Sequence, residues 1–196
     1  MSKDFLSSLR PAIVMTILFA LLLGIAYPLA MTGIGQAIFP SAANGSLIRD
    51  DGERVIGSTV IGQAFTADRY FQTRPSAAGK GYDGRASGGS NLGPAAQALT
   101  DRVKADVEKR RAEGVTGAIP ADLVTASGSG LDPDISPASA MAQAARVARV
   151  RGLDEKQVLD LVRRNIEHPL LGFLSEDHVN VLALNRQLDQ LSGSAR

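Results

Sequence analysis

The stretch PAIVMTILFALLLGIAYPLA, Pro11–Ala30, decides the fold of this 196-residue chain. No charged residue occurs between Arg10 and Arg49. A helix rises about 1.5 Å per residue, so about 20 apolar residues span the roughly 30 Å hydrocarbon core of a bilayer. A helix in a soluble core would carry polar residues at a 3.6-residue period, whereas this run has little beyond Thr16. The pattern predicts a transmembrane anchor helix over residues 11–31.

Two alternatives for this segment stay open, a cleaved signal peptide and a helix of a soluble protein. A signal peptide has about 7–15 apolar residues before a cleavage site with small residues at its first and third positions. The apolar stretch here is longer, and the nearest candidate site, residues 28–30, begins with Pro28 where a small residue belongs. These features favour an uncleaved anchor.

The flanking charges predict the orientation of the anchor. Lys3 and Arg10 precede it, and positive charge is retained on the cytoplasmic side of a membrane. We therefore expect a cytoplasmic N-terminus, residues 1–10, in the cell inner membrane. Residues 41–196 are then one extracytoplasmic, periplasmic domain, and lipid is a partner of the helix.

Composition excludes several classes of protein. Lys and Arg total 21 and Asp and Glu total 20, which argues against a nucleic-acid binder. There is no Cys, so disulfides, thiolate metal sites and cysteine nucleophiles are ruled out. With two His in the chain, we expect no metal site.

The part after the anchor begins with strand signals. The turn Asp50-Asp51-Gly52-Glu53 lies between residues 47–49 and 54–56, and Asp-Gly supplies the positive φ that a tight hairpin requires. Residues 59–62 are expected to continue the second strand. Phe65, Tyr70 and Phe71 are expected in the core, and the glycines of residues 79–93 exclude regular helix.

Helix signals dominate the rest of the chain. Pro94 is expected to open a helix with an apolar stripe, which ends at Gly114. Residues 122–125 are expected to form a short strand. Further helices follow Ser136 and Asp154, which are good N-cap residues, and begin near Asn180. The expected fold is α+β, with an early strand set and late helices.

No motif for chemistry emerges from the sequence. There is no phosphate loop and no nucleophile elbow, so we predict no catalytic residues. Asp132-Pro133-Asp134 begins like a calcium loop, but Pro137 replaces the required Gly and Gln143 replaces the bidentate Glu. Ser87-Gly88-Gly89-Ser90-Asn91 is similar to the ABC-transporter signature, yet no phosphate loop accompanies it. We interpret it as a structural loop or a contact for a partner.

Longer strings in a fixed order identify a family. The chain resembles the KdpC family, the C subunit of the bacterial Kdp potassium-transporting P-type ATPase, over nearly its whole length. The strings that carry the resemblance are Asn44-Gly45-Ser46-Leu47-Ile48, Ile61-Gly62-Gln63, Arg74-Pro75-Ser76-Ala77, Ser87-Gly88-Gly89-Ser90-Asn91-Leu92-Gly93-Pro94, Pro120-Ala121-Asp122-Leu123-Val124-Thr125, Leu131-Asp132-Pro133 and Val179-Asn180-Val181-Leu182.

The resemblance implies a non-catalytic accessory subunit of a high-affinity, ATP-driven potassium import complex. Its partners would be a channel-like A subunit, an ATP-hydrolysing B subunit and a small F subunit. The C subunit is needed for assembly and is described as a catalytic chaperone that raises the ATP affinity of the B subunit. It would bind no cofactor tightly, and ATP would act through the B subunit. The alternative is a solitary membrane-anchored extracytoplasmic binding module, or an enzyme, unrelated to potassium transport.

The resemblance also links Gln143 to ATP. Direct contact conflicts with the predicted orientation, because ATP is cytoplasmic and Gln143 is expected on the other side of the bilayer. A structural position or a partner contact is the alternative. The sequence departs from the family pattern nearby at Ala144-Ala145, and also at Asp177-His178.

The anchor carries a row of small side chains. Ala12, Thr16, Ala20 and Gly24 lie four residues apart and so lie on one face of an α-helix. Small residues let helices approach closely in lipid. The row is interpreted as a packing face for a helix of a larger subunit, most plausibly the A subunit, and a chance arrangement is the alternative.

Overall fold

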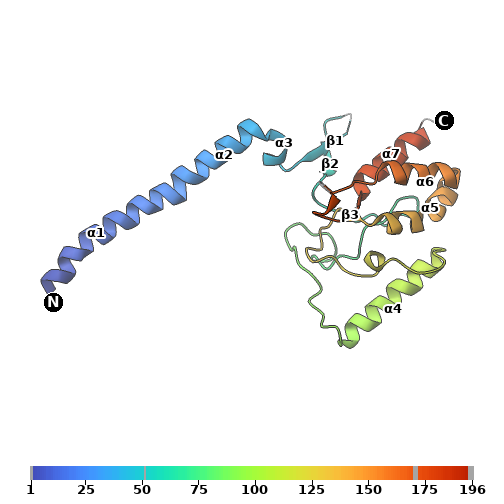
Figure 1. Ribbon diagram of the computed structural model, residues 1–196, viewed down its shortest axis with the longest axis horizontal. Coiled ribbons are helices and arrows are strands. Elements are labelled where there is room, and N and C mark those ends of the chain that lie inside the picture. The colour runs from blue at the N-terminus through green and yellow to red at the C-terminus, as the bar shows by residue number, and fades with distance from the viewer. Residues whose placement is uncertain (1, 51, 170–171, 194–196) are drawn as a thin grey trace. The chain divides into compact units, whose positions relative to one another are not determined.

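The computed structural model describes residues 2–50, 52–169 and 172–193, and the chain divides into two compact units between Leu47 and Ile48. The first unit is almost wholly helical, and the second contains the strands and the remaining helices (Figure 1). The mixed content, with strands early and helices late, confirms the predicted α+β fold.

A long helix with a widened turn in it makes up most of the first unit. It consists of α1 (Ser2–Leu21), the π-helical turn η1 (Leu22–Ala26) and α2 (Tyr27–Ile38). Pro28 explains the turn: it has no N–H for the carbonyl of Gly24, and its ring would clash with that carbonyl in a regular α-helix. Widening the turn relieves this clash.

By length and composition, the stretch Ser7–Ile38 is long and apolar enough to cross a membrane, a test that a signal sequence near an N-terminus also passes. The helix therefore extends seven residues beyond residue 31, where the predicted anchor ends. A short helix, α3 (Pro40–Ala43), follows it.

The predicted hairpin is present, but the position of its positive φ and the end of its second strand differ from the prediction. Strands β1 (Leu47–Arg49) and β2 (Val55–Ser58) form a two-stranded sheet. The Asp50 carboxylate accepts hydrogen bonds from the backbone N–H groups of Gly52 and Arg54, and the positive φ lies on Glu53, at 58°. The expected continuation of the strand over residues 59–62 is wrong, because the chain turns there and Ser58 pairs with Ile61.

Three helices and a small sheet build the core of the second unit. Helices α5 (Pro137–Arg151), α6 (Glu155–Arg164) and α7 (Val181–Gly193) pack with the antiparallel pair β3 (Asp134–Ile135) and β4 (Val179–Asn180). The predicted N-caps are confirmed. The Ser136 hydroxyl accepts from the Ser139 N–H at 3.1 Å, and the Asp154 carboxylate accepts from the Lys156 N–H at 3.1 Å.

Irregular chain completes the core. Phe71 is fully buried, and its backbone N–H and C=O both bond to the Asn185 amide at 2.9 Å. Tyr70, expected in the core, instead lies half-buried between the guanidinium groups of Arg69 and Arg151. The buried apolar side chains include Ile135, Ala140, Ala144, Val147, Val158, Leu161, Val162, Val179, Val181, Leu184 and Leu188.

Helix α4 (Gln97–Ala112) lies apart from the other three helices (Figure 1). It begins after Pro94, which was expected to open it. The expected strand over residues 122–125 is wrong: Ala121–Leu123 form a 3-10 turn, η2. The Asp122 carboxylate there accepts hydrogen bonds from the Ser136 N–H at 2.7 Å and from the Ser139 hydroxyl at 2.5 Å. These contacts with the start of α5 hold the segment as a turn.

Candidate functional site

Gln143, the residue that the family resemblance links to ATP, lies on the inner face of α5 and is fully buried. Its side-chain oxygen accepts from the Gln72 N–H and from an Arg146 guanidinium N–H, each at 2.8 Å. Its side-chain nitrogen donates to the carbonyls of Gln72 and Ser139 at 3.1 and 3.3 Å. Two bonds to the oxygen and two from the nitrogen use the full capacity of the amide.

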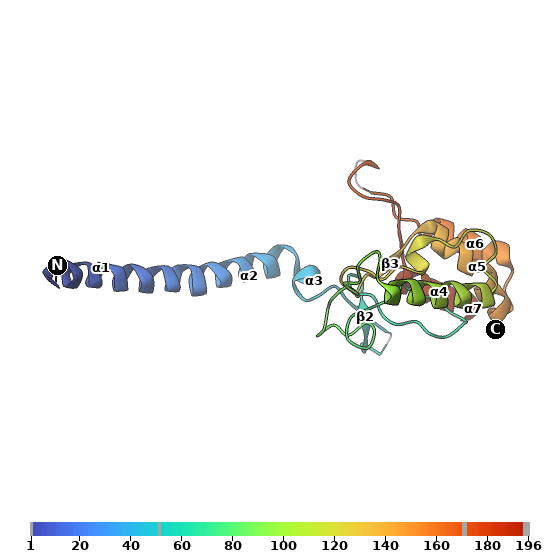
Figure 2. The same ribbon diagram turned by 90° about the horizontal axis from the view of Figure 1, so that it is seen from below.

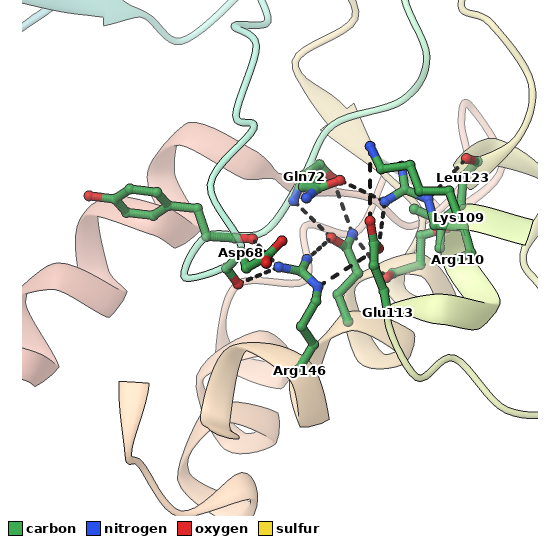
Figure 3. Close-up of polar contacts among 10 residues, drawn as sticks. Asp68, Gln72, Lys109, Arg110, Glu113, Leu123 and Arg146 are labelled. Atoms are coloured by element: carbon green, nitrogen blue, oxygen red, sulfur yellow. Dashed lines mark hydrogen bonds and ion pairs between the residues drawn. The ribbon is translucent and has the colours of Figure 1, made fainter. Parts of the chain in front are cut away.

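Arg146 extends this arrangement to α4. Its guanidinium donates to the backbone carbonyls of Asp68 and Tyr70, and its Nε lies 3.8 Å from the Glu113 carboxylate (Figure 3). The same Glu113 carboxylate oxygen also lies 2.9 Å from a guanidinium nitrogen of Arg110. Burial lowers the pKa of Arg146, and the nearby Glu113 charge opposes this effect.

Arg110 is the last residue of this hydrogen-bonded arrangement. It is the buried residue of α4, and it donates to the Gln72 side-chain oxygen at 2.7 Å and to the Leu123 carbonyl (Figure 3). We call Gln72, Arg110, Glu113, Gln143 and Arg146 the Gln143 network. It joins α4, α5 and the chain around Gln72 through charge-assisted hydrogen bonds. Gln72, Arg110, Gln143 and Arg146 are buried, and Glu113 is partly buried.

Arg110 and Glu113 are not among the site residues predicted from the sequence. Arg110 follows Val107 by three residues, so it lies on the same face of α4 as the apolar stripe. This position was the one sequence feature that could have indicated its burial. Leu99, Val103 and Val107 themselves are half-buried. The helix is therefore held by its charged C-terminal end more than by its apolar face.

The loop Ser87–Asn91 packs against a second Gly-Ser run. The Ser87 hydroxyl and the Gly88 N–H both donate to the Ser129 carbonyl, at 3.0 and 2.8 Å. A Cβ on Gly89 would lie 3.1 Å from the Gly128 carbonyl oxygen. Ser87 through its hydroxyl, and Gly88 and Gly89 through their backbone, thus contribute to the contact between the two runs. Ser90 and Asn91 follow, with a positive φ of 51° at Asn91.

The small residues of the anchor are all exposed in this chain. Ala12, Thr16 and Ala20 lie in α1, and the Thr16 hydroxyl donates to the Ala12 carbonyl at 2.8 Å. Gly24 lies in η1, and nothing comes within 4 Å of a Cβ placed on it. The α-helical spacing assumed for the row therefore holds from Ala12 to Ala20 and changes before Gly24.

An open acidic cleft of about 640 Å³ lies between η2, β3 and the chain before β4. Burial raises the pKa of Asp134, and a hydrogen bond from Asn180 opposes this shift. Arg74 pairs with Asp132 at 2.9 Å. Within residues 2–50, 52–169 and 172–193, no three His, Cys, Asp or Glu side chains gather in a way that could hold a metal ion. The lining includes Asp122, Asp132, Asp134, Ser175, Glu176, Asp177 and His178.

These features define a class of protein: one apolar helix near the N-terminus, followed by a small α+β unit that has an apolar core and a buried polar network beside it. The particular family follows from comparison, since residues 9–190 match the family model described as KdpC: K+-transporting ATPase, c chain. The chain belongs to the KdpC family.

Relatives agree over nearly the whole length. A protein of Caulobacter vibrioides is 59% identical over 184 residues, which are 94% of this chain and 93% of that protein. One of Methylobacterium nodulans is 52% identical over 96% of this chain and 99% of its own length. One of Myxococcus xanthus is 51% identical over 98% of this chain and 90% of its own length. Each is named a potassium-transporting ATPase KdpC subunit.

Proposed function

We propose that this chain is a non-catalytic accessory subunit of a high-affinity, ATP-driven potassium import complex. The observation that carries the proposal is kinship with KdpC proteins that spans both the apolar helix and the folded unit. Its partners are the channel-like A subunit, the ATP-hydrolysing B subunit and the small F subunit, and nucleic acid is not among them.

The chain is a single-pass protein of the cell inner membrane. Lys3 and Arg10 hold the N-terminus in the cytoplasm, and the unit from Ile48 onward is periplasmic. The exposed apolar surface of the helix meets lipid and the helices of the larger subunits. Ala12, Thr16 and Ala20 form one face that packs on a helix of the A subunit, and Gly24 extends this contact at the π-helical turn, where the spacing changes.

The chain raises the ATP affinity of the B subunit without holding nucleotide or another cofactor itself. Two observations support the absence of direct nucleotide contact at Gln143: its amide has no spare hydrogen-bonding group, and the side chain is fully buried. An effect on ATP is then a coupling free energy, transmitted through the complex. Gln143 contributes as a positioning residue that holds the chain at Gln72 against α5.

Growth and kinetics test the proposal together. A strain that lacks its own C subunit is supplied with this chain and its cognate A, B and F subunits, and is grown in limiting potassium. Restored growth, and a lower KM for ATP in the purified complex with the chain than without it, are expected. Failure of the chain to co-purify with the B subunit would contradict the proposal.

A further inference from the structure

Residues 165–169 and 172–178, between α6 and β4, project from the rest of the folded unit (Figure 2). Its two sides are joined where the backbone of Glu167 and that of His178 exchange hydrogen bonds of 2.8 and 3.1 Å. The His168 ring nitrogen then lies 2.8 Å from the Asp177 carboxylate. The chain continues from His178 directly into β4, so the base of the projection is fixed to the small sheet.

The projection carries large apolar side chains in solvent. Phe173 is 74% exposed and Leu174 is 60% exposed, and Gly172 before them has a φ of 73°. Phe173 is the most exposed large hydrophobic side chain described in the folded unit. Adjacent apolar side chains on a projecting, anchored loop indicate a contact surface, because their burial by a partner removes apolar area from water.

Charge distinguishes among the possible occupants. Residues 165–178 contain no Lys or Arg, whereas Glu167, Glu176 and Asp177 are exposed carboxylates on the same projection. Glu176 and Asp177 also line the acidic cleft at the base of the projection. Surfaces that bind anionic bilayers carry Lys and Arg instead. A second copy of the chain would place carboxylates against carboxylates.

We infer that Phe173 and Leu174 anchor a docking surface for a larger subunit of the transport complex. The matching surface is an apolar pocket bordered by Lys or Arg, whose cations face Glu176 and Asp177. The aromatic anchor supplies the apolar contact, and the carboxylates supply orientation and partner choice. This inference rests on the proposed membership of the complex.

The experiment uses the complete complex in membranes. A photoreactive phenylalanine analogue replaces Phe173, and a second sample carries it in place of Val60, which is 60% exposed. We expect position 173 to cross-link to one of the larger subunits at least about tenfold more than position 60, as for a residue at the centre of an interface. Cross-linking of position 173 to lipid, to a second copy of this chain or to nothing would overturn the inference.

Binding provides the second readout. The full chain is titrated into detergent-solubilised complex that lacks it. The Phe173→Ser/Leu174→Ser variant is expected to raise the apparent Kd about 30-fold, as for loss of a hot spot, and Val60→Ser less than about twofold. Glu176→Lys should raise the Kd and reduce its dependence on salt.

The two readouts separate the two hypotheses. If the unmodified chain does not bind the other subunits, the proposed function fails. If it binds and the double variant binds equally well, the docking surface alone is wrong.

Discussion

Replacing Gln143 by Ala distinguishes a positioning residue from a nucleotide ligand. The substitution removes the acceptor for the Gln72 N–H and for one Arg146 N–H, and it removes the donor to the Gln72 carbonyl. All three groups lie at fully or nearly fully buried residues. The change therefore acts on the free energy of unfolding of the folded unit.

The magnitude follows from the groups left without partners. Each buried polar group without a partner costs about 1–3 kcal/mol, so three such groups, partly relieved by water entering the vacated space, cost about 3–5 kcal/mol. For a chain of this size, 1 kcal/mol shifts Tm by about 2–4 °C. Gln143→Ala is thus expected to lower Tm by about 10 °C.

Thermal unfolding of the detergent-solubilised full chain measures this shift. Gln97→Ala is the matched control, since Gln97 is exposed on α4 and bonds only to Asp101 among the interactions described for it. Its Tm should change by no more than about 2 °C. The reasoning is refuted if Gln143→Ala leaves Tm unchanged yet abolishes cross-linking of a photoreactive ATP analogue to this chain.

Three further predictions concern other regions. Gly130→Ala should lower the free energy of unfolding, measured with denaturant, by about 2–5 kcal/mol, because φ is 68° and the new Cβ would lie 2.6 Å from a backbone nitrogen. Gly117→Ala is the control: φ is 78° but the space around it is open, so it should lower the free energy of unfolding by about 1–2 kcal/mol. Asp134→Asn should raise Tm at pH 7 and leave it unchanged below pH 3.8, the ordinary carboxyl value. Ala20→Leu with Gly24→Leu should reduce recovery of the larger subunits in affinity purification and slow growth in limiting potassium.

The sign of the Asp134 effect comes from linkage. Burial raises the pKa of this carboxyl in the folded state, so the folded protein holds the proton more tightly than the unfolded chain. The protonated Asp134 carboxyl therefore contributes its whole stabilisation at pH values below its pKa in the unfolded chain. That contribution is lost as the pH rises through its pKa in the folded protein. Asn removes the buried charge at pH 7, and a lower Tm at pH 7 would contradict the argument.

The other two predictions have equally direct checks. Equal destabilisation by Gly130→Ala and Gly117→Ala would show that the close packing at Gly130 does not matter. For the anchor, Leu22→Ala and Ile17→Ala should do little. The packing face is wrong if the bulky substitutions leave assembly unchanged, or if an unrelated membrane helix replaces residues 11–30 with full function.

Local signals predicted the helical core well. Ser136 followed by Pro137 marked the start of α5, Asp154 marked the start of α6, and Gly152 between them has the positive φ of a helix end. Each of these signals acts within about four residues of its own position, because capping bonds join near neighbours in sequence. Sequence reasoning is therefore reliable there.

Features that depend on contacts between segments far apart in the sequence were not predicted. The run at 122–125 has strand-like composition, but the Asp122 carboxylate bonds to residues 14 and 17 positions later and holds a turn. Arg110 belongs to a buried network whose members come from residue 72 to residue 146. A lone charged residue on a helix ordinarily indicates a solvated face, so only the fold reveals its buried partners.

We propose that this chain promotes ATP use by its complex without touching ATP. The measurement is the KM for ATP of the purified complex, with and without the chain, combined with photo-cross-linking by an ATP analogue under the same conditions. We expect a lower KM for ATP with the chain present and labelling confined to the ATP-hydrolysing subunit. An unchanged KM, or labelling of this chain that excess ATP suppresses, would contradict it.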